Sequence, residues 1–99
     1  MPGFIYMRAT LNGTVIAESD DTVVVEGNHY FPMAALDPAV IGSSDLQTEC
    51  HWKGTASYYD ITINGDTASN AAWYYPEPKE KAVEITDRVA FARPVVVEA

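Results

Sequence analysis

Cysteine and basic residues are both scarce in this sequence of 99 residues. The single cysteine excludes a disulfide within the chain. Six Lys and Arg stand against 14 Asp and Glu, which gives a net charge of -8, and the cations are scattered from Arg8 to Arg93. Such a chain repels phosphate backbones and anionic lipid headgroups. We therefore expect it to bind neither nucleic acid nor membranes.

Long hydrophobic runs are absent as well. No stretch approaches the roughly 20 apolar residues that span a bilayer. The first residues, MPGFIYMRATLNG, contain no basic region, and Arg8 interrupts their apolar run, which is not the pattern of a signal peptide. Together with the unpaired cysteine, these features predict a cytoplasmic protein.

Motifs for metals, phosphates and nucleophiles are also missing. The candidate ligands Cys50, His29 and His51 lack the paired spacings of tetrahedral zinc sites. The chain has no P-loop, no dinucleotide-binding loop and no nucleophile elbow. GSSD at 42–45 is similar to the start of nucleotidyltransferase sites, but no carboxylate pair follows it to hold Mg²⁺. We predict no metal and no cofactor, while a Ser-His-Asp triad of distant residues stays open.

The sequence does contain the turn signals that are typical of a β protein. The dipeptides Asn12-Gly13, Gly27-Asn28 and Asn64-Gly65 each stand beside short β-branched or alternating runs, a strong signal for hairpins. RVAF and VVVE near the C-terminus add two more short strands. We predict a mainly β fold over 1–99, a single compact domain of short antiparallel strands and hairpins.

Helical signals are limited to two segments. FPMAALDPAVIG has Asp37 as an N-cap and Pro38 at the first helical position, and EPKEKAVEI allows one more turn. Neither segment is long enough for an amphipathic helix that carries the core. The prediction therefore includes one or two short helical turns.

The segment ECHWKGTASYYDI, residues 49–61, concentrates reactive side chains. If 47–53 is a strand, Cys50 and Trp52 point inward while His51 and Lys53 point outward. This predicts a buried structural cysteine and a solvated histidine. The alternative is an enzyme in which Cys50 is a nucleophile or redox thiol assisted by His51 or His29.

Aromatic residues cluster in the middle of the chain and predict a binding surface. Part of this group is expected to fill the core, because aromatic side chains dominate small cores. The others would form a cleft for an unknown small molecule, with a lysine as its charged anchor. The candidate ligand-binding residues are Trp52, Lys53, Tyr58, Trp73 and Tyr75. A homodimer formed through an exposed strand edge is a further alternative.

CHWKGTASYYDI, followed by DTASNAAWYYPEPKEKAVEITDRVAF, resembles the small bacterial family known as domain of unknown function 427. The resemblance covers about 9–91. It implies a β-tent fold like that of the Mss-four-like and methionine sulfoxide reductase B proteins, whose zinc site on four cysteines this chain cannot form. The family is also labelled a nucleotidyltransferase domain family, which implies that activity. His51 departs from the proline usual in the family, and Ala92 from an aromatic residue.

Overall fold

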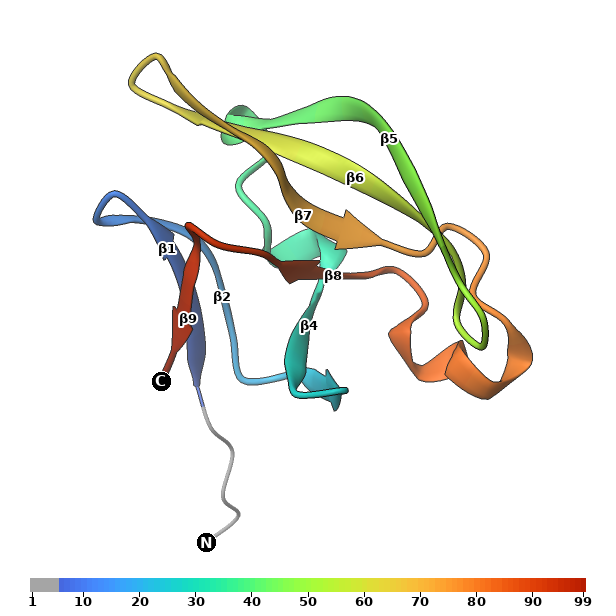
Figure 1. The fold of residues 1–99 in the computed structure, drawn as a ribbon. Coiled ribbons are helices and arrows are strands. Elements are labelled where there is room, and N and C mark those ends of the chain that lie inside the picture. The colour runs from blue at the N-terminus through green and yellow to red at the C-terminus, as the bar shows by residue number, and fades with distance from the viewer. Residues whose placement is uncertain (1–5) are drawn as a thin grey trace, which may run out of the picture.

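Tight hairpin turns organise the chain in the computed structural model, which describes residues 6–99. β1 (Met7–Leu11) and β2 (Thr14–Ser19) are joined by Asn12-Gly13. Both turn residues have positive φ, 51° and 80°, as a type I′ turn requires. Asn64-Gly65 makes the same turn between β6 (Gly54–Ile63) and β7 (Asp66–Tyr74), with φ of 51° and 85°. These two hairpin predictions are confirmed (Figure 1).

The hairpin predicted at Gly27-Asn28 exists, but its turn lies one residue earlier. β3 (Val23–Val25) and β4 (Asn28–Pro32) are joined by Glu26-Gly27, with φ of 54° and 80°. Asn28 already pairs with Val25 in the ladder. The turn thus places a glutamate where asparagine, aspartate or glycine is favoured, since that position needs positive φ.

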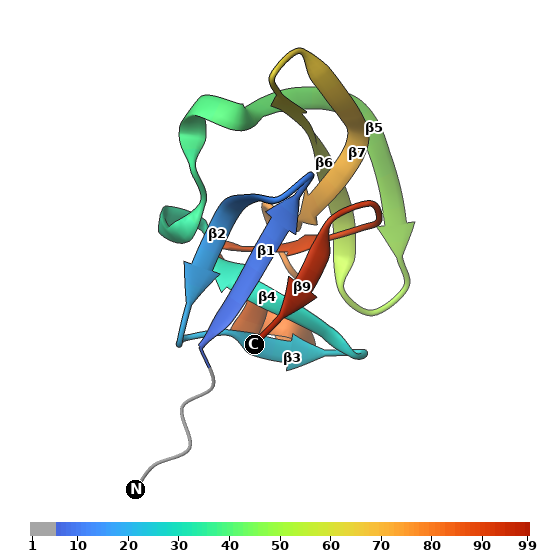
Figure 2. The ribbon, with the colours of Figure 1, turned by 90° about the vertical axis from the view of Figure 1, so that its left-hand side faces the viewer.

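Two antiparallel sheets result from these pairings. The larger sheet has the order β3-β4-β8-β7-β6-β5, and the smaller has β2-β1-β9. Figure 2 looks onto the smaller sheet, with the β3–β4 hairpin beneath it and the β5–β7 strands above it. The remaining strands are β5 (Ile41–Cys50), β8 (Arg88–Phe91) and β9 (Val96–Glu98). The prediction of a mainly β fold is confirmed.

Both segments predicted to be helical form short 3₁₀ turns. The first contains η1 (Met33–Ala35) and η2 (Pro38–Val40), and the second contains η3 (Glu80–Ile85). The Asp37 carboxylate accepts a hydrogen bond from the Ala39 amide at 3.0 Å, so it caps η2 as predicted. Within residues 6–99, no helix is long and apolar enough to cross a membrane.

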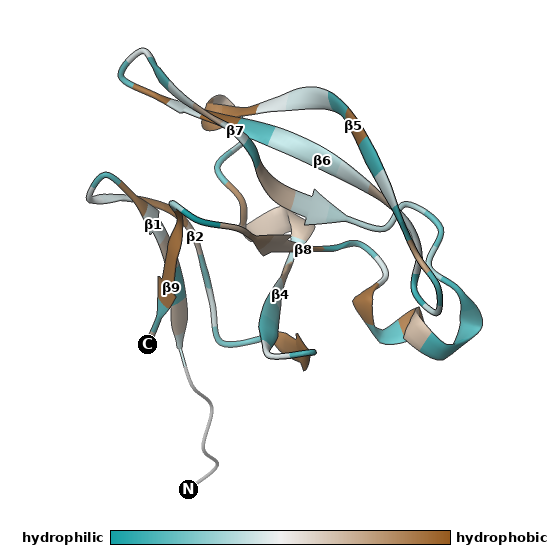
Figure 3. Ribbon diagram, viewed as in Figure 1, coloured by the Kyte–Doolittle hydropathy of each residue, from teal (hydrophilic) through white to brown (hydrophobic). Residues whose placement is uncertain are grey.

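Two groups of buried residues form the core. The first lies between the small sheet and the centre of the large one, and it includes Phe31 and Phe91, whose rings meet edge to face at 5.5 Å. The second surrounds Tyr30 and Tyr75 and reaches η3 through Ile85. The β5–β6 ribbon carries mostly hydrophilic or neutral residues (Figure 3). The second group positions the candidate site described next.

Candidate functional site

The strand predicted at 47–53 ends early, and this changes the surroundings of Lys53. β5 stops at Cys50, residues 51–53 form a turn, and β6 begins at Gly54, which pairs with Cys50. His51 is exposed, as predicted. Lys53, predicted to point outward, is only 6% exposed, so that prediction is wrong. Strand alternation does not apply to a residue in a turn.

Backbone contacts hold this turn against the segment that precedes η3. The Lys79 amide donates to the Lys53 carbonyl at 2.9 Å, and the Lys79 ammonium donates to the His51 carbonyl at 3.0 Å. Gly54 has φ of 117°, and a Cβ atom there would lie 3.2 Å from the Glu77 carbonyl oxygen. Glycine is therefore required at this close approach.

Three side chains surround the Lys53 ammonium and, with Lys53, are called the Lys53 cluster: Glu26, Trp52 and Tyr75. The Glu26 carboxylate accepts a hydrogen bond from the ammonium and pairs with it. The ring centroids of Trp52 and Tyr75 lie 5.6 Å and 5.5 Å from Nζ, within the range of cation–π attraction. The buried charge is thus compensated on several sides.

The electrostatics of the Lys53 cluster keep the pair ionised. Burial lowers the pKa of Lys53, but the hydrogen bond to Glu26 and the charges that Tyr30, Tyr75 and Cys50 can carry outweigh it, so the net pKa is raised. The hydrogen bonds from Lys53 and then Trp52 lower the pKa of Glu26. At neutral pH Lys53 is a cation and not a free amine, which suits binding of an anion rather than nucleophilic attack.

Beside the Lys53 cluster lie three further aromatic residues. Trp73 donates through its indole N–H to the Tyr30 hydroxyl at 3.1 Å, and their rings cross at 88°. Tyr58 packs against Trp73 with centroids 6.5 Å apart, and its hydroxyl lies 3.0 Å from Thr48 Oγ1. Tyr58 and Trp73 face each other because they are paired across β6 and β7.

The five predicted ligand-binding residues therefore adjoin the same part of the core. Tyr75 belongs to the second buried group, and Trp52, Tyr58 and Trp73 are partly buried against it. Lys53 reaches Trp52 and Tyr75 directly. A surface pocket of about 210 Å³ is lined by other residues: Gln47, Thr55, Ser57, Pro76 and Glu77. Thr55 and Ser57 alternate along β6 with Ala56 and Tyr58. The pocket therefore opens on the face of β6 opposite to the face that carries Tyr58.

The three residues predicted as catalytic candidates have separate surroundings. Cys50 is half-buried against the second core group. The His29 Nδ1 atom lies 2.8 Å from Thr22 Oγ1, and His51 is exposed on the turn. Among the residues that the structure describes, no group of three or more His, Cys, Asp or Glu side chains is arranged to hold a metal ion.

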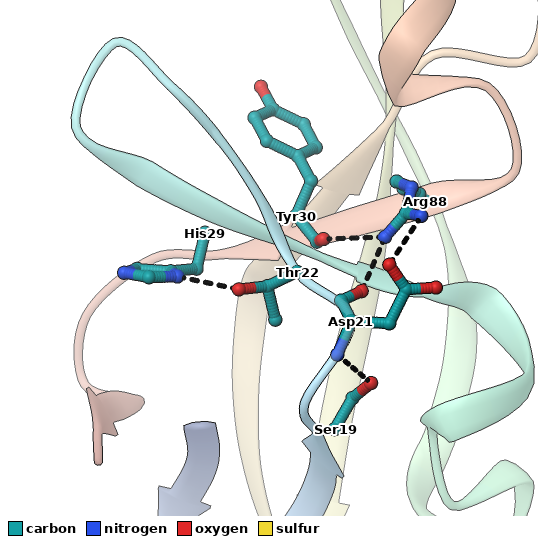
Figure 4. A network of polar contacts seen from close by, with 6 residues as sticks. All are labelled: Ser19, Asp21, Thr22, His29, Tyr30 and Arg88. Carbon is teal, nitrogen blue, oxygen red and sulfur yellow. Dashed lines mark hydrogen bonds and ion pairs between the residues drawn. The ribbon is translucent and has the colours of Figure 1, made fainter. Parts of the chain in front are cut away.

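A polar network fixes the base of the β3–β4 hairpin (Figure 4). The tip of this hairpin carries Glu26. The Arg88 guanidinium donates to the Asp21 carbonyl at 2.6 Å, to the Asp21 carboxylate at 3.1 Å and to the Tyr30 carbonyl at 3.3 Å. The Tyr30 ring points away from this network. Arg88 therefore anchors the backbone of Tyr30, while the Tyr30 hydroxyl accepts the hydrogen bond from Trp73.

Sequence reasoning missed two members of this region, Glu26 and Tyr30. Glu26 meets Lys53 from a distant hairpin, so no local spacing joins them. A signal was nevertheless present, because EG is a poor substitute for the NG of the other hairpins. Tyr30 belonged to the recognised aromatic group, but the sequence did not distinguish it from the other aromatic residues.

Comparison with known protein families identifies a match for this chain. The profile of a family described as "Domain of unknown function (DUF427)" matches residues 6–99. No curated protein matches the sequence. The description assigns no activity, so function must be argued from the residues themselves.

Proposed function

We propose that this chain, which belongs to the DUF427 family, binds a small molecule. The binding surface is formed by Trp52, Lys53, Tyr58, Trp73 and Tyr75. The observation that carries the proposal is Lys53, a residue that is 6% exposed and whose ammonium lies over the rings of Trp52 and Tyr75. A buried charge costs free energy that a hydrophobic side chain of similar size would not. We infer that the charge is kept for recognition.

Partial exposure of the neighbouring rings supports this proposal. Trp52, Tyr58 and Trp73 are each half-buried, so each has one side in the core and another available to a ligand. A tryptophan or tyrosine ring offers a flat apolar surface with a polar group at its edge. A suitable ligand has a flat apolar body and a group that interacts with a cation.

A thermal-shift screen against a metabolite library tests the proposal. A ligand present at ten times its Kd stabilises the folded state by about 1.4 kcal/mol. For a domain of this size that amounts to a rise in Tm of roughly 5–10 °C. We expect at least one such ligand for the natural protein, and loss of its shift in Lys53→Ala and in Lys53→Met, which keeps the length of the side chain.

Lys81→Met is the matched control, because Lys81 is also a lysine but is exposed on η3. It removes one positive charge without changing the Lys53 cluster and should keep the shift. A library without any stabilising compound, or a shift that survives in both Lys53 variants, would contradict the proposal.

A second candidate function is self-association through β5. Within residues 6–99, this ten-residue strand is the last of the larger sheet and pairs with β6 alone. Seven of its ten residues are exposed, and Ile41, Ser44 and Cys50 are half-buried. An uncovered edge of this length offers backbone N–H and C=O groups to a second copy of the chain.

A further inference from the structure

We propose that Trp52 and Lys53 form a fork that binds a carboxylate, and that Glu26 occupies this fork as an internal stand-in for the carboxylate of a ligand. The inference rests on the proposed function, because it names the chemical class of ligand for that same surface. It identifies a small organic acid with a flat apolar body as the ligand, and Glu26 as the group that the ligand displaces.

The first argument is the way in which Glu26 is held. The Lys53 ammonium donates to Oε1 of Glu26, and the Trp52 indole N–H donates to Oε2 at 3.4 Å. Each carboxylate oxygen therefore has a donor of its own. A carboxylate that arrived with a ligand would accept the same two hydrogen bonds, and charge-assisted bonds of this kind are the stronger ones in proteins.

The second argument is the difference in burial between the two charged partners. The Lys53 side chain is 8% exposed, whereas the Glu26 side chain is 50% exposed. The carbonyl of Lys53 is also bonded to the Lys79 amide, while Glu26 stands at the tip of the β3–β4 hairpin. Exchange of the carboxylate thus requires only Glu26 to turn outward, and Lys53 stays in place.

The third argument is the backbone at Glu26. Its φ of 54° is the conformation that Asn12 and Asn64 adopt at the same position of the other two type I′ turns. Turn geometry favours asparagine or glycine at this position and gives no reason for glutamate. The contact with Lys53 and Trp52 supplies that reason, because asparagine is one methylene shorter.

The test compares benzoate binding to the natural protein and to Glu26→Asn by calorimetry. Asparagine suits the turn and removes the competing carboxylate, whose tethering gives it a high effective concentration. We expect the variant to bind benzoate at least ten-fold more tightly. Glu26→Gln, which keeps the length of the side chain, should also bind more tightly, and benzamide, which lacks the charge, should bind to neither protein.

Glu84→Asn is the control for net charge, because Glu84 is exposed on η3. It should bind benzoate as the natural protein does. Equal benzoate affinity in the natural protein and in both Glu26 variants would overturn the role of Glu26. Tighter binding of inorganic phosphate than of benzoate would overturn the assignment to carboxylates.

The outcome also separates this inference from the proposed function. A library compound that needs Lys53, combined with no benzoate binding to any variant, overturns the carboxylate fork and leaves the proposed function in place. No library compound and no benzoate binding together overturn both.

Discussion

Lys53 shows how one buried charge shapes its neighbours. The hydrogen bond from its ammonium lowers the pKa of Glu26, and the rings of Trp52 and Tyr75 lie within 6 Å of Nζ. Burial raises the pKa of Tyr75, so this phenol stays neutral beside the cation. The residue pair Glu26–Lys53 is therefore ionised at neutral pH, where its contribution to stability is expected to be fully present.

At acid pH, the pair should lose its contribution to stability. The pKa of Glu26 in the folded protein lies below its ordinary value of 4.5, so its stabilising effect is present above that pH and is lost as the pH falls further. We expect the difference in stability between the natural protein and Glu26→Gln to shrink between about pH 6 and pH 3. Urea unfolding at several pH values measures it, and a constant difference would contradict the prediction.

At the scale of elements, the strands were predictable and the site was only partly so. Asn12-Gly13 and Asn64-Gly65 carry strong local signals, and the hairpins that they predict are present. The turn at 51–53 has no such signal before Gly54, so strand alternation predicts that Lys53 points outward, whereas the structure buries it. Its contact with Glu26 joins two hairpins, which only tertiary packing brings together.

Gly54 provides a test of how this turn is held. Alanine at φ of 117° is strained, and its Cβ would press on the Glu77 carbonyl at 3.2 Å. We expect Gly54→Ala to lower the free energy of unfolding by about 2–3 kcal/mol, measured by urea denaturation. Gly42→Ala is the control, because a Cβ at Gly42 meets nothing within 4 Å. Equal effects of the two substitutions would contradict this reading of the turn.

At the scale of the molecule, the proposed self-association through the edge of β5 can be tested directly. If they pair through this edge, light scattering of a concentrated sample should give twice the chain mass of 10.8 kDa. Leu46→Lys should restore the monomer, because a lysine on an edge strand opposes pairing. Leu46 is 40% exposed on β5.

Val83→Lys is the matched control, since Val83 is 67% exposed on η3 and lies outside β5. This variant should keep the dimer. A monomeric mass for the natural protein at high concentration, or a dimer that survives in Leu46→Lys, would exclude pairing through this edge.

The small sheet pairs strands that are far apart in the sequence, and this separation bears on the order of folding. Arg8 of β1 pairs with Glu98 of β9, so opposite ends of the chain meet in one ladder. β5, β6 and β7 pair as sequence neighbours, and their contacts need only short loops to close. We therefore infer that the β5–β7 region forms early and that β1 acquires its second neighbour late.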